Sequence, residues 1–300
     1  MQMREWLDHN DARPGEDDDR ATGYPFGFMD EGAKREVRRS ILKAVAIPGY
    51  QVPYGSREMP IARGWGTGGI QITLSLVLPE DVLKVIDQGC DGSVNAVNIK
   101  KFVQAVADVE ITTDTRSATV IQTRHRIPEE PMTAEQILVL QVPYPEALRE
   151  VEPSEAETRR MHAEADYSRM WLFLYEDIVK YGEISISYRF PVTVNGRYIM
   201  DPSPIPRWDV PKLHMADTLF LFGAGREKRI YAIPPHTRVE PLEFEDHLFR
   251  VEDFSGKVCA RCGASDTFMD EIIDNEAGER LYYCSDSGYC DKRYGQCNNH

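Results

Sequence analysis

The sequence predicts a mixed α/β protein with helices around a central mixed sheet, a helical and hairpin insertion, and a C-terminal, zinc-ribbon-like module rich in cysteine. Three observations carry this prediction. Helical and strand-like periodicities both recur along the chain, the β–α alternation is too irregular for a TIM barrel, and four of the six cysteines lie between residues 259 and 290. With 300 residues, the chain is long enough to bury a sizeable core.

Changes in composition divide the chain into four parts. Residues 1–23 are acidic and poor in large apolar groups, as in a disordered extension. The core is expected to combine residues 24–126 with 207–254. Prolines punctuate the start of residues 127–206, which we interpret as an insertion that docks a partner, and residues 255–300 form the cysteine module.

The first half of the chain predicts two longer helices and two strands. Asp30 is suited to cap a helix that runs to Ala46 and ends before Pro48-Gly49. A loop rich in glycine and proline follows, and residues 70–78 alternate as in a strand. Pro79 then predicts a short helix through residue 86, followed by a helix over 93–106 and a strand over 118–126.

The second half begins with a capping box, Ser154-x-x-Glu157, which predicts a long helix to about Tyr181. On this helix, His162 is expected to be structural or exposed. Residues 183–190 alternate as a strand, and Asn195-Gly196 predicts a hairpin. Further strands are expected over 219–222, 230–233, 268–273 and 280–283.

The charge and the N-terminal sequence limit the classes of partner. A net charge of −14 and a pI near 5.0 argue against a general nucleic-acid surface. The N-terminal segment lacks the apolar core of a signal peptide, and no run is long enough to span a membrane, so we expect a cytoplasmic protein. Cys90 is interpreted as a small buried side chain and Cys297 as a tail residue.

The cysteines follow the pattern C-x2-C-x21-C-x5-C at Cys259, Cys262, Cys284 and Cys290. The first pair, followed by Gly263, is typical of a metal knuckle, and a hairpin would bring the second pair to the same ion. One interpretation is a structural zinc site. Because the last gap is unusually wide, the alternative is an iron–sulfur cluster on three cysteines, with one reactive cysteine left over.

Three segments are candidates for binding an anionic group. The loop over residues 64–69 offers backbone N–H groups at Gly66 and Gly68, and a tight structural loop is the alternative. The cluster Arg124, His125 and Arg126 ends a predicted strand, and a solvated strand end is the alternative. In the turn over 223–229, two glycines precede three cations, Arg226, Lys228 and Arg229, and a solvated hairpin tip is the alternative.

Several of these motifs together resemble one family. They are the runs over 39–53, 64–69, 195–206 and 222–232, in this order, and the four cysteines. The chain resembles the PhnJ family, the catalytic subunits of bacterial carbon–phosphorus lyase, from about residue 23 to residue 290. This family consists of radical S-adenosylmethionine enzymes whose cysteine spacing departs from the common C-x3-C-x2-C.

The resemblance implies roles for individual residues. Cys259, Cys262 and Cys284 would hold a [4Fe-4S] cluster that binds S-adenosylmethionine, and a 5'-deoxyadenosyl radical would take a hydrogen atom from Gly49. Gly49 would be the glycyl radical site and Cys290 the thiyl radical site. The implied substrate is alpha-D-ribose 1-methylphosphonate 5-phosphate, and the implied products are 5-phospho-alpha-D-ribose 1,2-cyclic phosphate and methane.

The resemblance also implies partner subunits. These are PhnG, PhnH and PhnI in a core complex, with PhnK as an ATP-binding cassette partner that the insertion would dock. A second hypothesis comes from another class of function, a non-catalytic scaffold subunit in which the four cysteines hold zinc. Zinc could also replace the cluster in an active enzyme, because four converging thiolates suit it.

Overall fold

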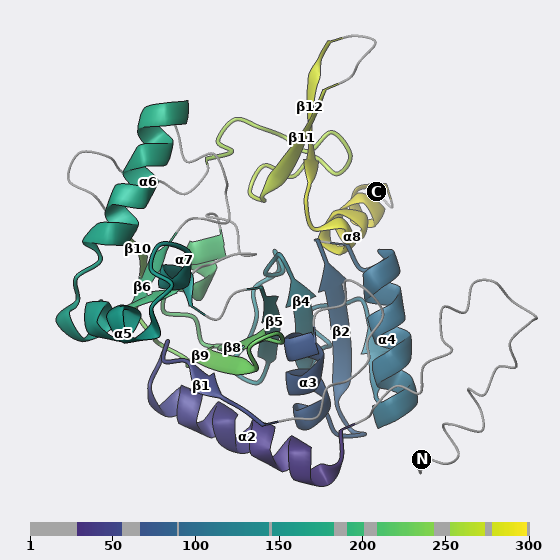
Figure 1. Ribbon diagram of the computed structural model, residues 1–300. Helices are drawn as coiled ribbons and strands as arrows, with labels where there is room; N and C mark the ends of the chain where they lie inside the picture. Colours follow the sequence, from purple (N-terminus) through teal and green to yellow (C-terminus); the bar gives the residue numbers. More distant parts are fainter. Residues whose placement is uncertain are drawn as a thin grey trace, which may run out of the picture.

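The computed structural model describes residues 29–55, 67–88, 90–143, 146–182, 191–200, 209–242, 253–273 and 278–298. Its centre is a seven-stranded mixed sheet in the order β1-β9-β8-β5-β4-β2-β3 (Figure 1). The strands are β1 Val52–Pro53, β2 Val82–Asp87, β3 Glu110–Thr112, β4 Val120–Arg124, β5 Ile137–Val142, β8 Leu219–Ala224 and β9 Arg229–Ile233.

The five strands from β3 to β8 are parallel, and β9 and β1 add antiparallel pairs at the other edge. The register aligns Asp87 with Arg124, Arg124 with Gln141, and Gln141 with Gly223, so the carboxyl ends of four strands share one edge. The described strands form no closed barrel. The predicted mixed α/β class is confirmed.

Each face of the sheet packs its own hydrophobic core. On one face lie α2 Glu31–Ala46, α3 Thr67–Leu76 and α4 Val94–Ala107, against Leu83, Val85 and other inward side chains. On the other face, side chains such as Leu138 and Phe220 pack against the elements between β5 and β8. Because successive side chains of a strand point to opposite faces of the sheet, each buried strand contributes side chains to both cores.

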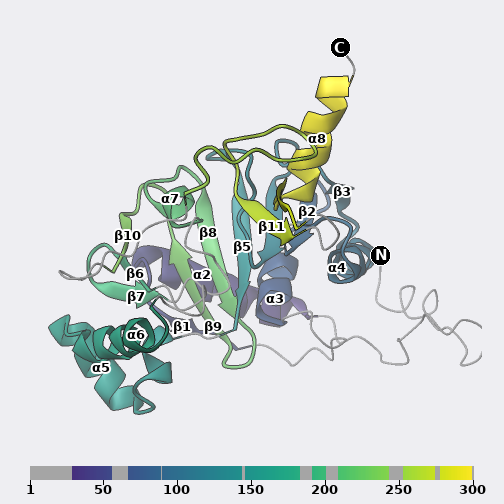
Figure 2. The same cartoon turned by 90° about the horizontal axis from the view of Figure 1, so that it is seen from above.

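The elements on the second face come mainly from the expected insertion. They are η1 Ala147–Glu150, α5 Glu155–Glu164, α6 Ser168–Tyr181, α7 Val210–Leu213, and a small sheet in the order β10-β6-β7, made of β6 Val192–Val194, β7 Tyr198–Met200 and β10 Val239–Pro241. The cysteine module contains β11 Met269–Ile273, β12 Arg280–Cys284 and α8 Ser287–Asn298. Both views place α8 beside β2 and far from α5 (Figures 1 and 2).

Several local predictions are confirmed. The Asp30 side chain accepts a hydrogen bond from the Ala33 N–H and caps α2, which ends at Ala46. Ser93 caps α4 in the same way. The Asn195-Gly196 turn joins β6 to β7, and both residues have positive φ, as the predicted hairpin turn requires. The predicted strand pair in the cysteine module is β11–β12.

Both predictions for residues 70–86 are wrong, since the structure has a helix where a strand was predicted and a strand where a helix was predicted. The expected strand over 70–78 is helix α3, whose residues 68–75 are all buried, so its burial has no helical period. Two of its buried polar side chains are hydrogen-bonded, since the Tyr54 hydroxyl donates to Gln71 and the Ser75 hydroxyl to the Gln71 carbonyl, whereas the buried Thr73 hydroxyl has no hydrogen-bond partner among the described residues. The expected helix through residue 86 is the buried strand β2, because periodicity does not separate short apolar runs.

The expected long helix from residue 154 to Tyr181 is two helices, because Ala165 adopts φ 52° and ends α5. Ser154 does cap α5 by accepting a hydrogen bond from the Glu157 N–H, but its own N–H donates to Glu152 rather than to Glu157 as a full capping box requires. Strand β5, not foreseen from the sequence, lies inside the range expected for the insertion but pairs with β4 and β8 in the central sheet. The start of that range is therefore part of the core, and the division into domains stays a prediction.

Other predictions lie outside the described residues. These are the acidic extension, the strand over 183–190 and Gly66. Among the helices that the structure describes, none combines the length and the apolar character needed to cross a lipid bilayer.

Candidate functional site

Four cysteines converge in the C-terminal module. The Cys259–Cys262 knuckle turns at Gly263, whose φ of 71° favours glycine. Cys284 ends strand β12, opposite Met269, and Cys290 lies in the first turn of α8. The hairpin and the short link to α8 thus bring the distant pair to the knuckle, as the sequence predicted.

The geometry of the four sulfur atoms fits one metal ion. All four lie within 4.8 Å of one another and all four residues are buried. The Sγ atoms of Cys259 and Cys290 are 3.8 Å apart, and those of Cys262 and Cys284 are 3.5 Å apart. Around a tetrahedral zinc ion with Zn–S bonds of about 2.3 Å, sulfurs lie about 3.8 Å apart.

The same spacing does not fit a [4Fe-4S] cluster. A cubane of eight atoms needs more room between its ligand sulfurs than a single ion does, so Cys259, Cys262 and Cys284 would have to separate to hold one. In this arrangement Cys290 is also a fourth donor rather than a free thiol. The donor set suits either group, and the observed spacing suits a single ion.

Three of these cysteines have shifted thiol pKa values, and the shifts differ in direction. Burial opposes ionisation of Cys259, but backbone N–H groups of Cys262 and Cys284 donate to its sulfur and lower its pKa to about 6. Burial raises the pKa of Cys290 to about 12, and it raises the pKa of Cys284 as well. The fold therefore stabilises the thiolate of Cys259, and a bound cation would be needed to stabilise the thiolates of Cys284 and Cys290.

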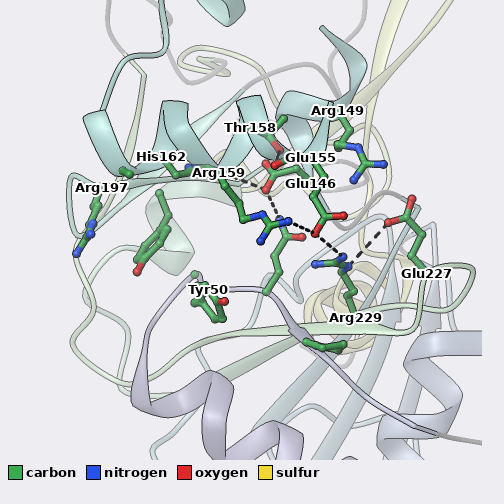
Figure 3. Close-up of a pocket in the computed structure, with 15 residues that line it drawn as sticks. Tyr50, Glu146, Arg149, Glu155, Thr158, Arg159, His162, Arg197, Glu227 and Arg229 are labelled. Carbon is green, nitrogen blue, oxygen red and sulfur yellow. Dashed lines mark hydrogen bonds and ion pairs between the residues drawn. The ribbon is translucent and has the colours of Figure 1, made fainter. Parts of the chain in front are cut away.

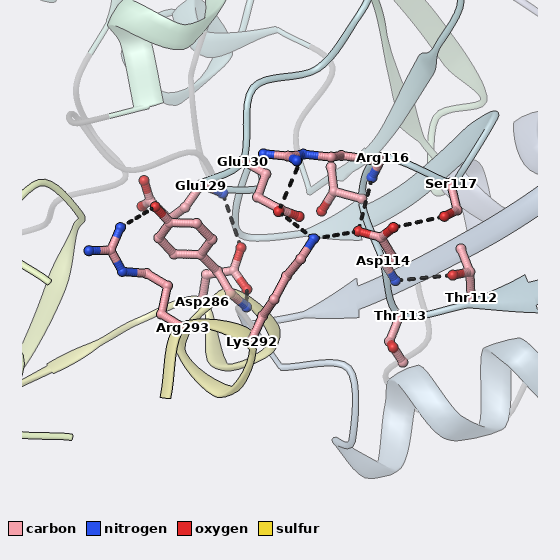
Figure 4. Close-up of polar contacts among 12 residues, drawn as sticks. Thr112, Thr113, Asp114, Arg116, Ser117, Glu129, Glu130, Asp286, Lys292 and Arg293 are labelled. Carbon is pink, nitrogen blue, oxygen red and sulfur yellow. Dashed lines mark hydrogen bonds and ion pairs between the residues drawn. The ribbon is translucent and has the colours of Figure 1, made fainter. Parts of the chain in front are cut away.

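The module is docked on the carboxyl edge of the sheet. Lys292 of α8 bonds Asp114 and Glu130 at 2.8 Å each, and Asp286 accepts from the Glu129 N–H at 3.0 Å (Figure 4). Arg126 pairs with Asp270 at 3.1 Å. These polar contacts place the four cysteines next to the loops that follow β3 and β4.

The predicted cluster Arg124, His125 and Arg126 lies on this edge. Arg124 holds Asp87 with two hydrogen bonds, at 2.8 and 3.0 Å, and the Arg126 guanidinium lies 4.9 Å from the Phe268 ring centre. Burial, followed by the charge of Arg124, lowers the pKa of His125. The two arginines take part in contacts within the chain, and anion binding by this cluster stays a prediction.

The glycines of the two predicted anion loops meet each other. A Cβ at Gly68 would lie 2.6 Å from the Gly225 nitrogen, and one at Gly223 would lie 2.6 Å from Ile72. The Gly69 N–H donates to the Gln141 side chain. These glycines let the start of α3 approach the end of β8, which is a packing role at the least.

Gly49 lines a pocket of about 440 Å³ between the β1–β9 edge of the central sheet and helix α5. Figure 3 shows the residues that line it. The φ of Gly49 is 77°, and a Cβ would lie 3.0 Å from the Val194 Cβ and 3.2 Å from the Tyr198 Cβ. The φ and the close contacts both favour glycine at this position. The other lining residues include Tyr50, Gln51, Glu146, Arg149, Glu155, Arg159, His162, Arg197, Tyr198, Glu227 and Arg229.

Most residues of this pocket were not predicted from the sequence. Of the three cations in the 223–229 turn, only Arg229 lines it, while Arg226 and Lys228 do not. One face of α5 supplies Glu155, Thr158, Arg159, His162 and Ala163. Their helical spacing was a signal available in the sequence, although it is also that of an ordinary solvated face.

Comparisons with known proteins agree over most of the chain. The sequence model of the family described as "Phosphonate metabolism protein PhnJ" matches residues 22–296. A protein of Rhizobium meliloti (strain 1021), named alpha-D-ribose 1-methylphosphonate 5-phosphate C-P-lyase, is 58% identical over 270 residues, which is 90% of this chain and 91% of the relative. A protein of the same name from Escherichia coli (strain K12) is 58% identical over 269 residues, 90% of this chain and 95% of the relative.

Proposed function

Because the chain belongs to the family of the phosphonate metabolism protein PhnJ, we propose that it is a carbon–phosphorus lyase acting on alpha-D-ribose 1-methylphosphonate 5-phosphate. The observation that carries the proposal is 58% identity to two relatives of that name over 90% of the chain. The proposed products are 5-phospho-alpha-D-ribose 1,2-cyclic phosphate and methane.

The proposed reaction is radical chemistry. A carbon–phosphorus bond to an alkyl group has no good leaving group, so the difficult step is assigned to a cofactor. A [4Fe-4S] cluster with S-adenosylmethionine, held by Cys259, Cys262 and Cys284, would supply one-electron chemistry when bound. The closed spacing of the thiols means that such binding requires the module to open.

Two residues of the chain carry the radical in this proposal. Gly49 would lose a hydrogen atom, and its lack of a side chain lets the resulting centre become planar between its neighbouring peptide groups. Gly49 would then take a hydrogen atom from the thiol of Cys290, and the thiyl sulfur would bond to phosphorus as the phosphorus–carbon bond breaks. The methyl radical so released would take a hydrogen atom from Gly49 to become methane, and the ribose 2-hydroxyl would displace the Cys290 sulfur from phosphorus to give the cyclic phosphate. The left-handed backbone and the pocket position of Gly49 support its part in this proposal.

The proposal includes partner subunits. We expect a core complex with PhnG, PhnH and PhnI, and an ATP-binding cassette partner, PhnK. Helix α6 offers a surface for docking, because Leu172 and Val179 are 54% and 68% exposed on it.

The test is production of methane. The native chain, assembled with its core partners, is reconstituted anaerobically with iron and sulfide and then given dithionite, S-adenosylmethionine and the ribose methylphosphonate. Methane is expected from the native chain and from Cys90→Ala, which changes a cysteine outside the cluster, but not from Cys290→Ala. Methane from Cys290→Ala would remove Cys290 as the thiyl site, and none from a native complex with a verified cluster would contradict the lyase proposal.

A second candidate function is a zinc-binding scaffold subunit. The specific observation in its favour is the closed arrangement of the four sulfurs around a space that suits one tetrahedral ion. The two candidates differ in the assay above, since a scaffold produces no methane in any metal state.

A further inference from the structure

The pocket beside Gly49 is strongly polar and has two unlike ends (Figure 3). Arginines from three elements gather at one end: Arg149 from η1, Arg159 from α5 and Arg229 from β9. Tyr50, His162 and Arg197 lie at the other end, and Gly49, which also lines the pocket, directly precedes Tyr50 in the chain. A volume of about 440 Å³ is the size of pockets that hold one small ligand.

Positive charge exceeds negative charge at the arginine end. Arg159 and Arg229 share one carboxylate, that of Glu155, at 3.3 and 3.8 Å. Glu227 lies 3.9 Å from Arg229, which is longer than a hydrogen bond. Among the described residues, Arg149 has no ion pair. Because these guanidinium groups share one carboxylate or have no ion pair in the described part of the chain, some of their N–H donors remain free for a second anion. The planar arrangement of those donors suits phosphate oxygens.

The Gly49 end has one cation, Arg197, whose guanidinium lies 5.8 Å from the Tyr198 ring centre, and otherwise offers neutral or paired polar groups. Glu146 accepts a hydrogen bond from the Gln51 side chain at 3.0 Å and lies 3.0 Å from His162 Nε2. His162 also packs near the Tyr198 ring, with centroids 6.2 Å apart. Carboxylate, imidazole and amide groups arranged in this way suit the hydroxyl groups of a sugar.

We propose that this pocket binds the phosphate monoester of a small sugar, with the phosphate at Arg149, Arg159 and Arg229 and the sugar toward Gly49. The site is separate from the cysteine module, since no residue of the module lines it. A part for this ligand in radical chemistry at Gly49 rests on the proposed function, but binding itself needs neither a cluster nor a partner subunit.

The test is calorimetric titration of the full chain at low ionic strength with D-ribose 5-phosphate, D-ribose and inorganic phosphate as separate probes. Saturable binding is expected for ribose 5-phosphate, weaker binding for inorganic phosphate, and none for ribose. Equal affinities for inorganic phosphate and the sugar phosphate would overturn the sugar part of the proposal. Absence of saturable binding by either anion would overturn it entirely, whether or not the methane assay succeeds.

Alanine substitutions test whether the pocket arginines bind the phosphate. Arg149→Ala and Arg159→Ala are each expected to weaken binding at least about tenfold, as loss of a hydrogen-bonded charge does. The matched control is Arg160→Ala, which removes the neighbouring arginine of α5, paired with Glu157 and Glu164 outside the pocket. It is expected to change affinity less than about twofold. Equal losses at positions 159 and 160 would show non-specific binding and overturn the assignment.

One variant is expected to gain affinity, so misfolding cannot imitate the result. Glu155→Gln removes the carboxylate that competes with phosphate for Arg159 and Arg229. Binding of ribose 5-phosphate should strengthen severalfold, with an unchanged circular dichroism spectrum. Weaker binding in this variant would mean that Glu155 is a ligand contact and would contradict the arrangement proposed here.

Discussion

Replacing Gly49 with alanine is expected to destabilise the protein by two separate effects. At φ 77° a residue with a side chain costs about 1–2 kcal/mol. The new Cβ would also lie 3.0 Å from the Val194 Cβ and 3.2 Å from the Tyr198 Cβ, and overpacking of this kind costs about 1–3 kcal/mol. The free energy of unfolding should therefore fall by about 2–5 kcal/mol.

The measurement is urea-induced unfolding followed by circular dichroism, and Gly182→Ala is the control. Gly182 has nearly the same backbone, φ 79°, but a Cβ there would meet no atom within 4 Å. The control should show only the backbone cost, and the difference between the two variants should be about 1–3 kcal/mol. Equal losses would refute the argument that close packing against β6 and β7 reserves this position for glycine.

Three further predictions concern metal binding, pH and buried charge. Protein purified in air should contain about one zinc per chain by elemental analysis, and Cys262→Ala should lose it, whereas retained zinc would contradict the tetrahedral site. Because burial lowers the pKa of His125, the unfolded chain takes up its proton first, so this residue should reduce stability as pH falls below about 6.5, measured as the urea midpoint. His125→Asn, which tolerates φ 77°, should lose less stability between pH 7.5 and 5.5, and an equal loss would refute this. Asp209→Ala should cost about 3–5 kcal/mol in chemical denaturation, because Asp209 is fully buried 3.0 Å from Lys212, and Asp217→Ala at an exposed position should cost less than about 0.5 kcal/mol.

Local chemistry explains which elements could be predicted from the sequence. The Asp30 cap and the Asn195-Gly196 turn act through neighbouring backbone groups. The residue types at these positions were therefore enough to predict the helix start and the hairpin turn. The ends of the cysteine pattern lie 31 residues apart, but its ligand type and spacing are themselves a signal of a metal site. Helix α3 and strand β2 are buried almost entirely, and a segment surrounded by core loses the polar side on which periodicity depends.

The set of residues that lines the pocket depends on the tertiary structure, and most of it could not be predicted from the sequence. Arg149, Arg159 and Arg229 are separated along the chain and meet only when η1 and α5 fold over β9. The sequence also singled out Arg124 as a candidate, but strand pairing places it across from Asp87, which accepts two of its hydrogen bonds. Strand register decides whether an arginine lies beside a carboxylate that can pair with it. Periodicity alone does not give that register.

The proposed transfer of hydrogen between Gly49 and Cys290 requires motion of the cysteine module, because Cys290 is only 3% exposed and packed among three thiols. The structure makes the module the movable part. Neither hydrophobic core on the sheet includes a buried residue of the module, whose own buried cluster consists of the four cysteines and Ala264. It is attached by polar contacts such as Lys292–Asp114, and a partly exposed ion pair contributes only about 0–1 kcal/mol. Lifting the module would break this pair and also the more buried contacts of Glu130 and Asp286, while both cores stay packed. Moving Gly49 would instead disturb the backbone hydrogen bond from its N–H to Ala232 in the central sheet.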